Sequence, residues 1–299
     1  MNSIPEKPIT HWRPVLAMAL MQGAIVMCWV VYRMYLPGLL GEFGFPKGAA
    51  LVILAIEGFL AVLIEPLFGS LSDRYKTLIG LRAPFITIGV LLTAAFMTLT
   101  PAIILLGSPD SFIRWIFIAV LLIWAMAMAM FRSPMLARLG EFACQRDWPY
   151  AASVLTLVGT IAGTLALPAS KQIVKGMGAW PAFTVSSIIL LLSATLLNKT
   201  QPPQVALSTT ATESGPQSSR KNLGLVALTG LTITLGIILT RQLIGLVGKE
   251  QTPALMTLFL VVQLITVLPI GWLSQKWGSL QTMIVGLGLL SIGFFVLLA

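Results

Sequence analysis

Long apolar runs, each close to twenty residues in length, fill most of this 299-residue chain. A helix of about 20 apolar residues is long enough to cross the hydrocarbon core of a bilayer. Pro or charged residues mark nearly every junction between the runs. The predicted spans are 14–37, 48–72, 84–106, 114–139, 151–170, 179–198, 223–247, 253–274 and 281–299. The sequence therefore predicts an all-α, multi-pass integral membrane protein in contact with the lipid bilayer.

The composition excludes several other classes of protein. Only 10% of the residues are charged and 57% are hydrophobic, whereas soluble domains are about 25% charged. The net charge of +9 is better explained by basic loops on one side of a membrane than by a nucleic-acid partner. Cys28 and Cys144 are not expected to pair, and they show no metal-ligand spacing. Because no catalytic set or phosphate-binding loop is present, we expect neither an enzyme nor a cofactor.

A polar segment divides the nine predicted spans into six and three. Residues 199–222 are rich in Ser, Thr and Pro and have no apolar period, which is typical of flexible linkers. We expect an N-terminal half of six helices (1–198), this cytoplasmic linker, and a partial C-terminal half of three helices (223–299). Transporters are often built from two similar halves, so about three C-terminal helices are predicted to be missing.

The Lys and Arg residues are unevenly divided between the two predicted sides of the membrane. Twelve of the nineteen fall on the side of the N-terminus and the linker. Because cytoplasmic loops carry the excess of basic residues, both segments should be cytoplasmic. A cysteine placed at Ser214, with the two native cysteines replaced, should react with an impermeant thiol reagent only after cells are permeabilised. Labelling in intact cells would show that the orientation is reversed.

One stretch recurs at corresponding places in the two halves. Residues 66–89 (PLFGSLSDRYKTLIGLRAPFITIG) resemble residues 268–286 (LPIGWLSQKWGSLQTMIVG). Such internal repeats are common in secondary transporters. The alignment pairs Glu65 with Val267, Gly69 with Gly271, Asp73 with Gln275 and Arg74 with Lys276.

The first copy of this stretch also resembles a known family. The pattern Gly69-x-Leu71-Ser72-Asp73-Arg74 is similar to the loop signature of the major facilitator superfamily. The longer pattern SDR-x5-G-x3-PF resembles the branch that contains the sucrose transporters and the glycoside-pentoside-hexuronide:cation symporters. Glu65-Pro66 and the segment 131–142 (FRSPMLARLGEF) resemble the same branch.

The resemblance implies a major facilitator-type bundle of two pseudo-repeated halves that works as a monomer. It implies a small-molecule substrate, such as a sugar, and a coupling cation. Some sugar-transporting relatives carry an acid in the first span, but none lies between Pro14 and Pro37. A pigment-delivery branch of the superfamily has a similar loop, so that alternative stays open.

Two spans carry charged residues inside their apolar runs. Glu65 lies eight residues before Asp73, which places it about 12 Å inside the membrane edge at the helical rise. Arg132 lies nine residues before Glu141, at a depth of roughly 13 Å. Intramembrane ionisable residues are usually functional, so Glu65 and Arg132 are candidates for cation coupling. The alternative is an ion pair that only orients two helices. A glutamate with an arginine nearby favours a proton as the coupling cation.

Other residues complete the candidate set. Glu57 lies two turns from Glu65 and about 80° around the same helix, so it is a second coupling candidate. The loop between the second and third spans is expected to act as a conformational latch. Its residues are Gly69, Asp73, Arg74, Gly80, Arg82 and Pro84. Candidates for the wall of a central cavity are Trp29, Tyr32, Trp124 and Arg241.

Two functional hypotheses follow. The first is a secondary transporter that moves a small solute by alternating access, driven by a proton or another cation. The second is a membrane factor that does not transport, but binds or delivers a hydrophobic ligand such as a (bacterio)chlorophyll-type pigment during complex assembly.

Overall fold

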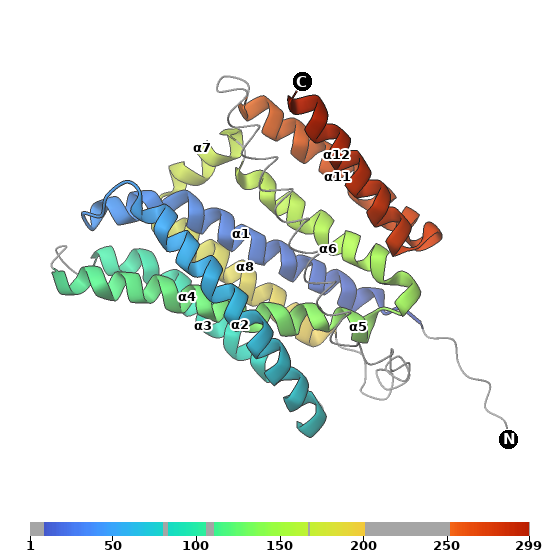
Figure 1. Cartoon of the computed structure of the whole chain (residues 1–299). Coiled ribbons are helices and arrows are strands. Elements are labelled where there is room, and N and C mark those ends of the chain that lie inside the picture. Colours follow the sequence, from blue (N-terminus) through green and yellow to red (C-terminus); the bar gives the residue numbers. More distant parts are fainter. Residues whose placement is uncertain (1–8, 80–82, 106–110, 167, 201–251, 299) are drawn as a thin grey trace.

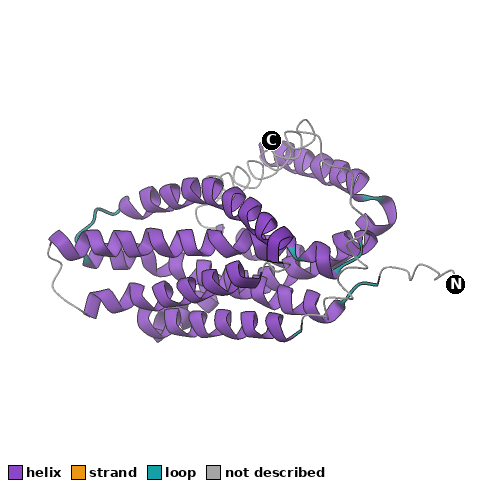
Figure 2. Cartoon of the chain, turned by 90° about the horizontal axis from the view of Figure 1, so that it is seen from below, coloured by secondary structure: helices purple, strands orange, loops and turns teal. Residues whose placement is uncertain are grey.

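The computed structural model describes residues 9–79, 83–105, 111–166, 168–200 and 252–298, and these form helices joined by short loops (Figure 2). The longer elements are α1 (Trp12–Glu42), α2 (Ala49–Ile79), α3 (Ala83–Leu105), α4 (Ser111–Ala137), α6 (Trp148–Gly163), α8 (Ala179–Lys199), α11 (Thr252–Trp277) and α12 (Ser279–Leu298). The shorter ones are α5 (Leu139–Phe142), α7 (Pro168–Met177) and two 3-10 turns at Gln145–Asp147 and Thr164–Ala166. The predicted span 223–247 and nearly all of the predicted linker lie outside the described residues.

Seven helical segments in the described part of the chain are long and apolar enough to cross a membrane. They are Trp12–Glu42, Ala49–Tyr75, Pro84–Ile103, Phe112–Phe142, Gln145–Ala166, Ala179–Lys199 and Thr257–Trp277. For the described residues, the prediction of an all-α structure with several helices of membrane-spanning length is confirmed. The last predicted span, 281–299, corresponds to α12, and its final residue lies outside the described part.

The predicted span 151–170 is wrong in its C-terminal part. Helix α6 ends at Gly163, a 3-10 turn follows, and α7 begins as a separate helix at Pro168. Proline has no backbone N–H to donate, and its ring disfavours helical geometry in the residue before it. The chain therefore breaks here, and Lys175 lies in the last turn of a short helix rather than in a loop.

The helices form a chain of neighbours with α1 near its middle (Figure 1). Helix α2 packs on α4, α4 on α3, α3 on α8, α8 on α1, α1 on α6, α6 on α11, and α11 on α12. In α1, 61% of the most apolar window is buried, compared with 17% in α2. Helix α1 therefore lies at the centre of the bundle. It is apolar on all sides, as expected for a helix that other helices surround.

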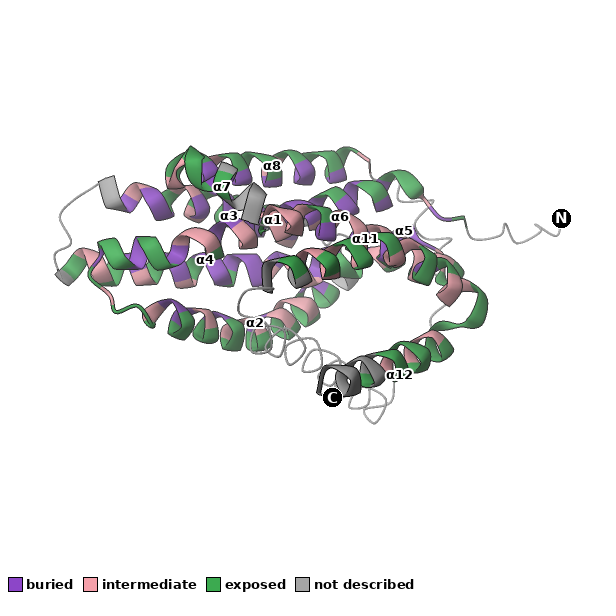
Figure 3. Ribbon diagram, turned by 90° about the horizontal axis from the view of Figure 1, so that it is seen from above, coloured by how far each residue is buried: buried purple, intermediate pink, exposed green. Residues whose placement is uncertain are grey.

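Exposed residues cover the outer faces of the helices (Figure 3), and many of these exposed residues are large and apolar. In α2, Leu51, Phe59 and Val62 each expose more than half of their surface. A soluble protein rarely exposes a continuous apolar surface of this kind. These side chains are therefore placed to contact lipid, as expected for a helix at the edge of a membrane bundle.

Among the described residues, glycines with positive φ lie in three turns between helices, including Gly44 (φ 70°) between α1 and α2. Gly178 (φ 84°) joins α7 to α8, and Gly278 (φ 92°) joins α11 to α12. Side chains with a Cβ rarely adopt this backbone conformation, which glycine adopts readily. The N–H of Gly278 also donates to the Ser274 carbonyl at 3.0 Å, which closes the end of α11.

Close packing of α3 on α4 depends on Gly89. A Cβ at this position would lie 2.6 Å from the Cβ of Phe131, which cannot move without the backbone. We expect Gly89→Ala to lower the free energy of unfolding by about 1–3 kcal/mol, as overpacking does. Thermal unfolding of the purified protein in detergent measures this. Gly58→Ala in α2 is the matched control, because no atom of the described residues lies within 4 Å of its added Cβ. Equal effects of both variants would contradict the argument.

Candidate functional site

Three aromatic side chains and one carboxyl group meet inside the bundle. The Tyr32 and Trp124 ring centroids are 4.3 Å apart, and Trp29 contacts both rings edge-on at 5.9 and 4.9 Å. Trp29 and Tyr32 come from α1, Trp124 from α4 and Glu57 from α2. Tyr32 and Trp124 are fully buried. We call Trp29, Tyr32, Trp124 and Glu57 the aromatic cluster.

Glu57 is the carboxyl group of this cluster. Only 2% of its surface is exposed, and the Tyr32 hydroxyl donates a hydrogen bond to its Oε1. Within the described residues, Glu57 Oε2 and the Trp124 indole Nε1 have no hydrogen-bond partner. One acceptor and one donor are thus buried with their hydrogen-bonding capacity unused, which lowers stability and makes both atoms candidates for contact with a ligand. The Arg33 guanidinium lies 5.4 Å over the Trp29 ring.

The Tyr32–Glu57 hydrogen bond can be tested by substitution. Glu57→Leu leaves the buried Tyr32 hydroxyl without an acceptor and should lower the free energy of unfolding by about 1–3 kcal/mol. Glu57→Gln keeps a carbonyl acceptor and should stay close to wild type. Adding Tyr32→Phe to Glu57→Leu should restore part of the loss, because both polar groups are then gone. Thermal unfolding of the wild type, Glu57→Leu, Glu57→Gln and the double variant measures these differences in stability. If Tyr32→Phe destabilises the Leu variant further, the hydrogen bond does not account for the effect.

A polar contact outside the aromatic cluster joins α2 to α4. Arg132 Nη1 donates to Glu65 Oε1 at 3.1 Å, so the two intramembrane charges form an ion pair. The pair is partly exposed, with 41% of the Arg132 side chain and 33% of the Glu65 side chain accessible. It therefore lies at the surface of the described bundle and not in its core.

The backbone around this pair has features that ease movement. Pro66 and Pro134 lie inside α2 and α4, one and two residues beyond the paired charges. Each proline removes a helical hydrogen bond and permits a bend. A Cβ at Gly69 would lie 2.7 Å from Ser133 Oγ, so the two helices approach closely here. Glycine permits this approach, as small residues do between membrane helices.

The predicted latch residues are only partly within the described chain. Asp73 and Arg74 are exposed in the last turns of α2, and Pro84 is exposed in the first turn of α3. The rings of Tyr75 and Phe85 lie 5.2 Å apart and connect the two helices. Gly80, Arg82 and the cavity candidate Arg241 lie outside the described residues.

Sequence reasoning missed a polar network around Asp147. This carboxylate accepts hydrogen bonds from Thr10 at 2.5 Å, from the Cys144 thiol at 3.2 Å and from the Gln275 side chain. The network joins the segment before α1, the start of α6 and the end of α11. Gln275 aligns with Asp73 in the internal repeat, and this alignment is the sequence signal that points to it. Asp147 and Thr10 gave no sequence signal.

Arg138 was also missed as a buried group. Only 3% of its surface is exposed, its Nε lies 3.5 Å from Glu141 Oε2, and its guanidinium lies 4.8 Å over the Phe142 ring. The sequence indicated only a basic loop residue. Both cysteines are free, as predicted. In the described part of the chain, no group of three or more His, Cys, Asp and Glu residues is placed to hold a metal ion.

The fold defines a class of protein: a multi-span α-helical membrane protein with seven apolar helical segments of spanning length in its described part. No protein-family model matches the chain, and no curated protein matches it.

Proposed function

We propose that this protein is a secondary transporter that moves a small solute across the membrane by alternating access, coupled to a proton. The Glu65–Arg132 ion pair between two apolar helices carries the proposal. A charged residue inside a membrane helix costs about 2.5–3.5 kcal/mol on insertion scales and is usually retained for function.

The proposed coupling step uses this pair. When α2 and α4 separate, the Glu65 carboxylate loses the cation that stabilises its charge. A proton taken up from water replaces that cation, and re-forming the ion pair releases the proton. Pro66 and Pro134 allow α2 and α4 to bend beside the pair. Proton uptake thereby accompanies one conformational switch and proton release the other.

The residues of the aromatic cluster favour a substrate that has a ring and hydroxyl groups. Aromatic faces bind the apolar face of a ring. Hydroxyl groups of the substrate can donate to Glu57 Oε2 and accept from Trp124 Nε1, the two polar atoms of the cluster that have no partner in the described residues. The Tyr32 and Trp124 rings are buried in this conformation, so binding of a substrate requires the bundle to open. We place the N-terminus and the linker on the cytoplasmic side, by the distribution of basic residues.

The test is uptake into proteoliposomes. A candidate solute, sugars first, should accumulate against its gradient when an inward proton gradient is imposed, and a protonophore should abolish accumulation. Empty liposomes and liposomes with heat-inactivated protein are the controls. If no proton or sodium gradient drives accumulation of any solute that stabilises the purified protein, the proposal is wrong.

A second candidate function is binding or delivery of a hydrophobic ligand such as a pigment. An open groove lined by Trp12, Tyr150 and Trp272 favours it. Co-purification of a coloured ligand or of a large membrane complex would support this function, and the absence of solute uptake would be consistent with it.

A further inference from the structure

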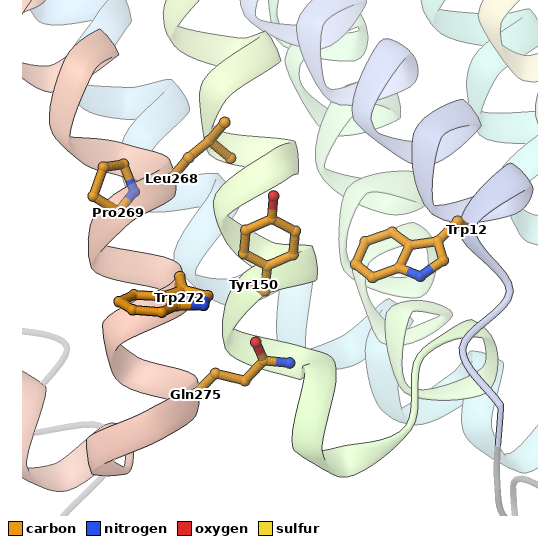
Figure 4. Close-up of a pocket in the computed structure, with 6 residues that line it drawn as sticks. All are labelled: Trp12, Tyr150, Leu268, Pro269, Trp272 and Gln275. Atoms are coloured by element: carbon orange, nitrogen blue, oxygen red, sulfur yellow. The ribbon is translucent and has the colours of Figure 1, made fainter.

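We propose that the groove between α1, α6 and α11 is a binding site for an anionic phospholipid. The groove has a volume of about 570 Å³ and is lined by Trp12, Tyr150, Leu268, Pro269, Trp272 and Gln275. Figure 4 shows Tyr150 of α6 between Trp12 of α1 and the side chains of α11. The proposal does not depend on transport.

The groove opens at one end of the bundle, where α1 and α6 begin and α11 ends. Trp12 is the first residue of α1, Tyr150 lies in the first turn of α6, and Trp272 lies in the last two turns of α11. Trp and Tyr favour the boundary between hydrocarbon and water, because their rings are apolar and carry one polar group. The groove is therefore placed at the depth where lipid headgroups begin.

The lining changes from apolar to polar towards this end. Leu268 and Pro269 lie deeper along α11, and Gln275 lies two turns nearer the helix end. The Trp12 and Tyr150 rings meet edge-on at 5.7 Å and form the opposite wall. An occupant must be apolar at one end and polar at the other, which describes a phospholipid with one acyl chain in the groove.

Basic residues lie on or beside the helix ends that form the polar end. The Lys276 ammonium lies 3.9 Å over the Trp272 ring, and Lys276 is exposed in the last turn of α11. Arg146 is exposed and interacts electrostatically with Asp147. Arg13 follows Trp12 and is also exposed.

The carboxylate at this end, Asp147, already has hydrogen-bond donors within the protein. Asp147 accepts hydrogen bonds from Thr10, Cys144 and Gln275. Among the described residues named at this end, three are basic (Lys276, Arg146 and Arg13) and one, Asp147, is acidic, so the site is complementary to an anionic headgroup. Basic sites between membrane helices at the cytoplasmic face recognise such headgroups.

Binding of fluorescent phosphatidylglycerol and phosphatidylcholine to the purified full chain in a neutral detergent tests the proposal. The wild-type protein should prefer phosphatidylglycerol. Since each basic residue near an anionic lipid contributes a factor of about five in affinity, Lys276→Gln should weaken phosphatidylglycerol binding about fivefold and leave phosphatidylcholine binding unchanged. Trp272→Ala should weaken both. Lys199→Gln is the matched control, because Lys199 is exposed at the end of α8 and does not line the groove.

Photo-crosslinking locates the site independently of variant folding. A phosphatidylglycerol with a photoreactive acyl chain should label the peptide that contains residues 268–276 in wild-type protein, and unlabelled phosphatidylglycerol should compete better than phosphatidylcholine. Equal competition by the two lipids, or labelling spread evenly over all spans, would overturn the proposal. A stoichiometric pigment in the organic extract that is lost in Trp272→Ala would also overturn it and would assign the groove to the second candidate function.

Discussion

Glu65→Gln is expected to abolish uphill accumulation of solute while leaving exchange of solute across the membrane intact. Glutamine keeps the shape of the side chain and can still accept a hydrogen bond from Arg132, which lies 3.1 Å from Glu65 in the structure. It cannot take up or release a proton, so the coupling step is lost and the conformational switch is retained. Proteoliposomes measure both activities, with a proton gradient for accumulation and preloaded solute for exchange.

Two further variants separate coupling from structure. Glu57→Gln should be milder, because Glu57 lies in the aromatic cluster and not in the exposed ion pair. Asp73→Asn should slow both accumulation and exchange, because it would weaken the proposed loop latch and leave the Glu65 carboxyl group unchanged. If Glu65→Gln accumulates solute as well as the wild type does, the Glu65–Arg132 pair only orients α2 and α4, and coupling lies elsewhere.

Trp124→Ala is expected to lower stability more than Gly89→Ala or Glu57→Leu does. Trp124 is fully buried and contacts both Tyr32 and Trp29. Replacing a buried Trp by Ala removes these ring contacts and leaves a cavity, which lowers the free energy of unfolding by about 3–5 kcal/mol. Thermal or denaturant unfolding in detergent measures the change.

Trp115 provides the matched control on the same helix. It is 70% exposed on α4, so Trp115→Ala removes few protein contacts and should change stability far less. If the two variants lose similar stability, the cluster around Trp124 does not contribute the packing that the structure indicates. Trp124→Phe should recover part of the loss, because it restores an aromatic face for Tyr32.

Local geometry made several features predictable from the sequence. An apolar run of about twenty residues forms a membrane helix because the bilayer leaves no other way to satisfy backbone hydrogen bonds. A constant helical rise then fixes depth, so Glu65 and Arg132 could be placed at one level before their helices were known to be neighbours. The break at Pro168 was missed, although its cause is local, because the apolar run continues on both sides of residue 163.

The contacts between helices had no comparable local signal. The period of a helix assigns a residue to a face, but the rotation of each helix and the choice of its neighbours depend on packing throughout the bundle. Glu57 could be assigned a depth and an angle from its position in the chain. Its hydrogen bond to Tyr32 and the packing of Trp124 on Tyr32 exist only because α1, α2 and α4 meet at that level. The same holds for Asp147 and Gln275, which lie 128 residues apart and become partners when α11 packs on the start of α6.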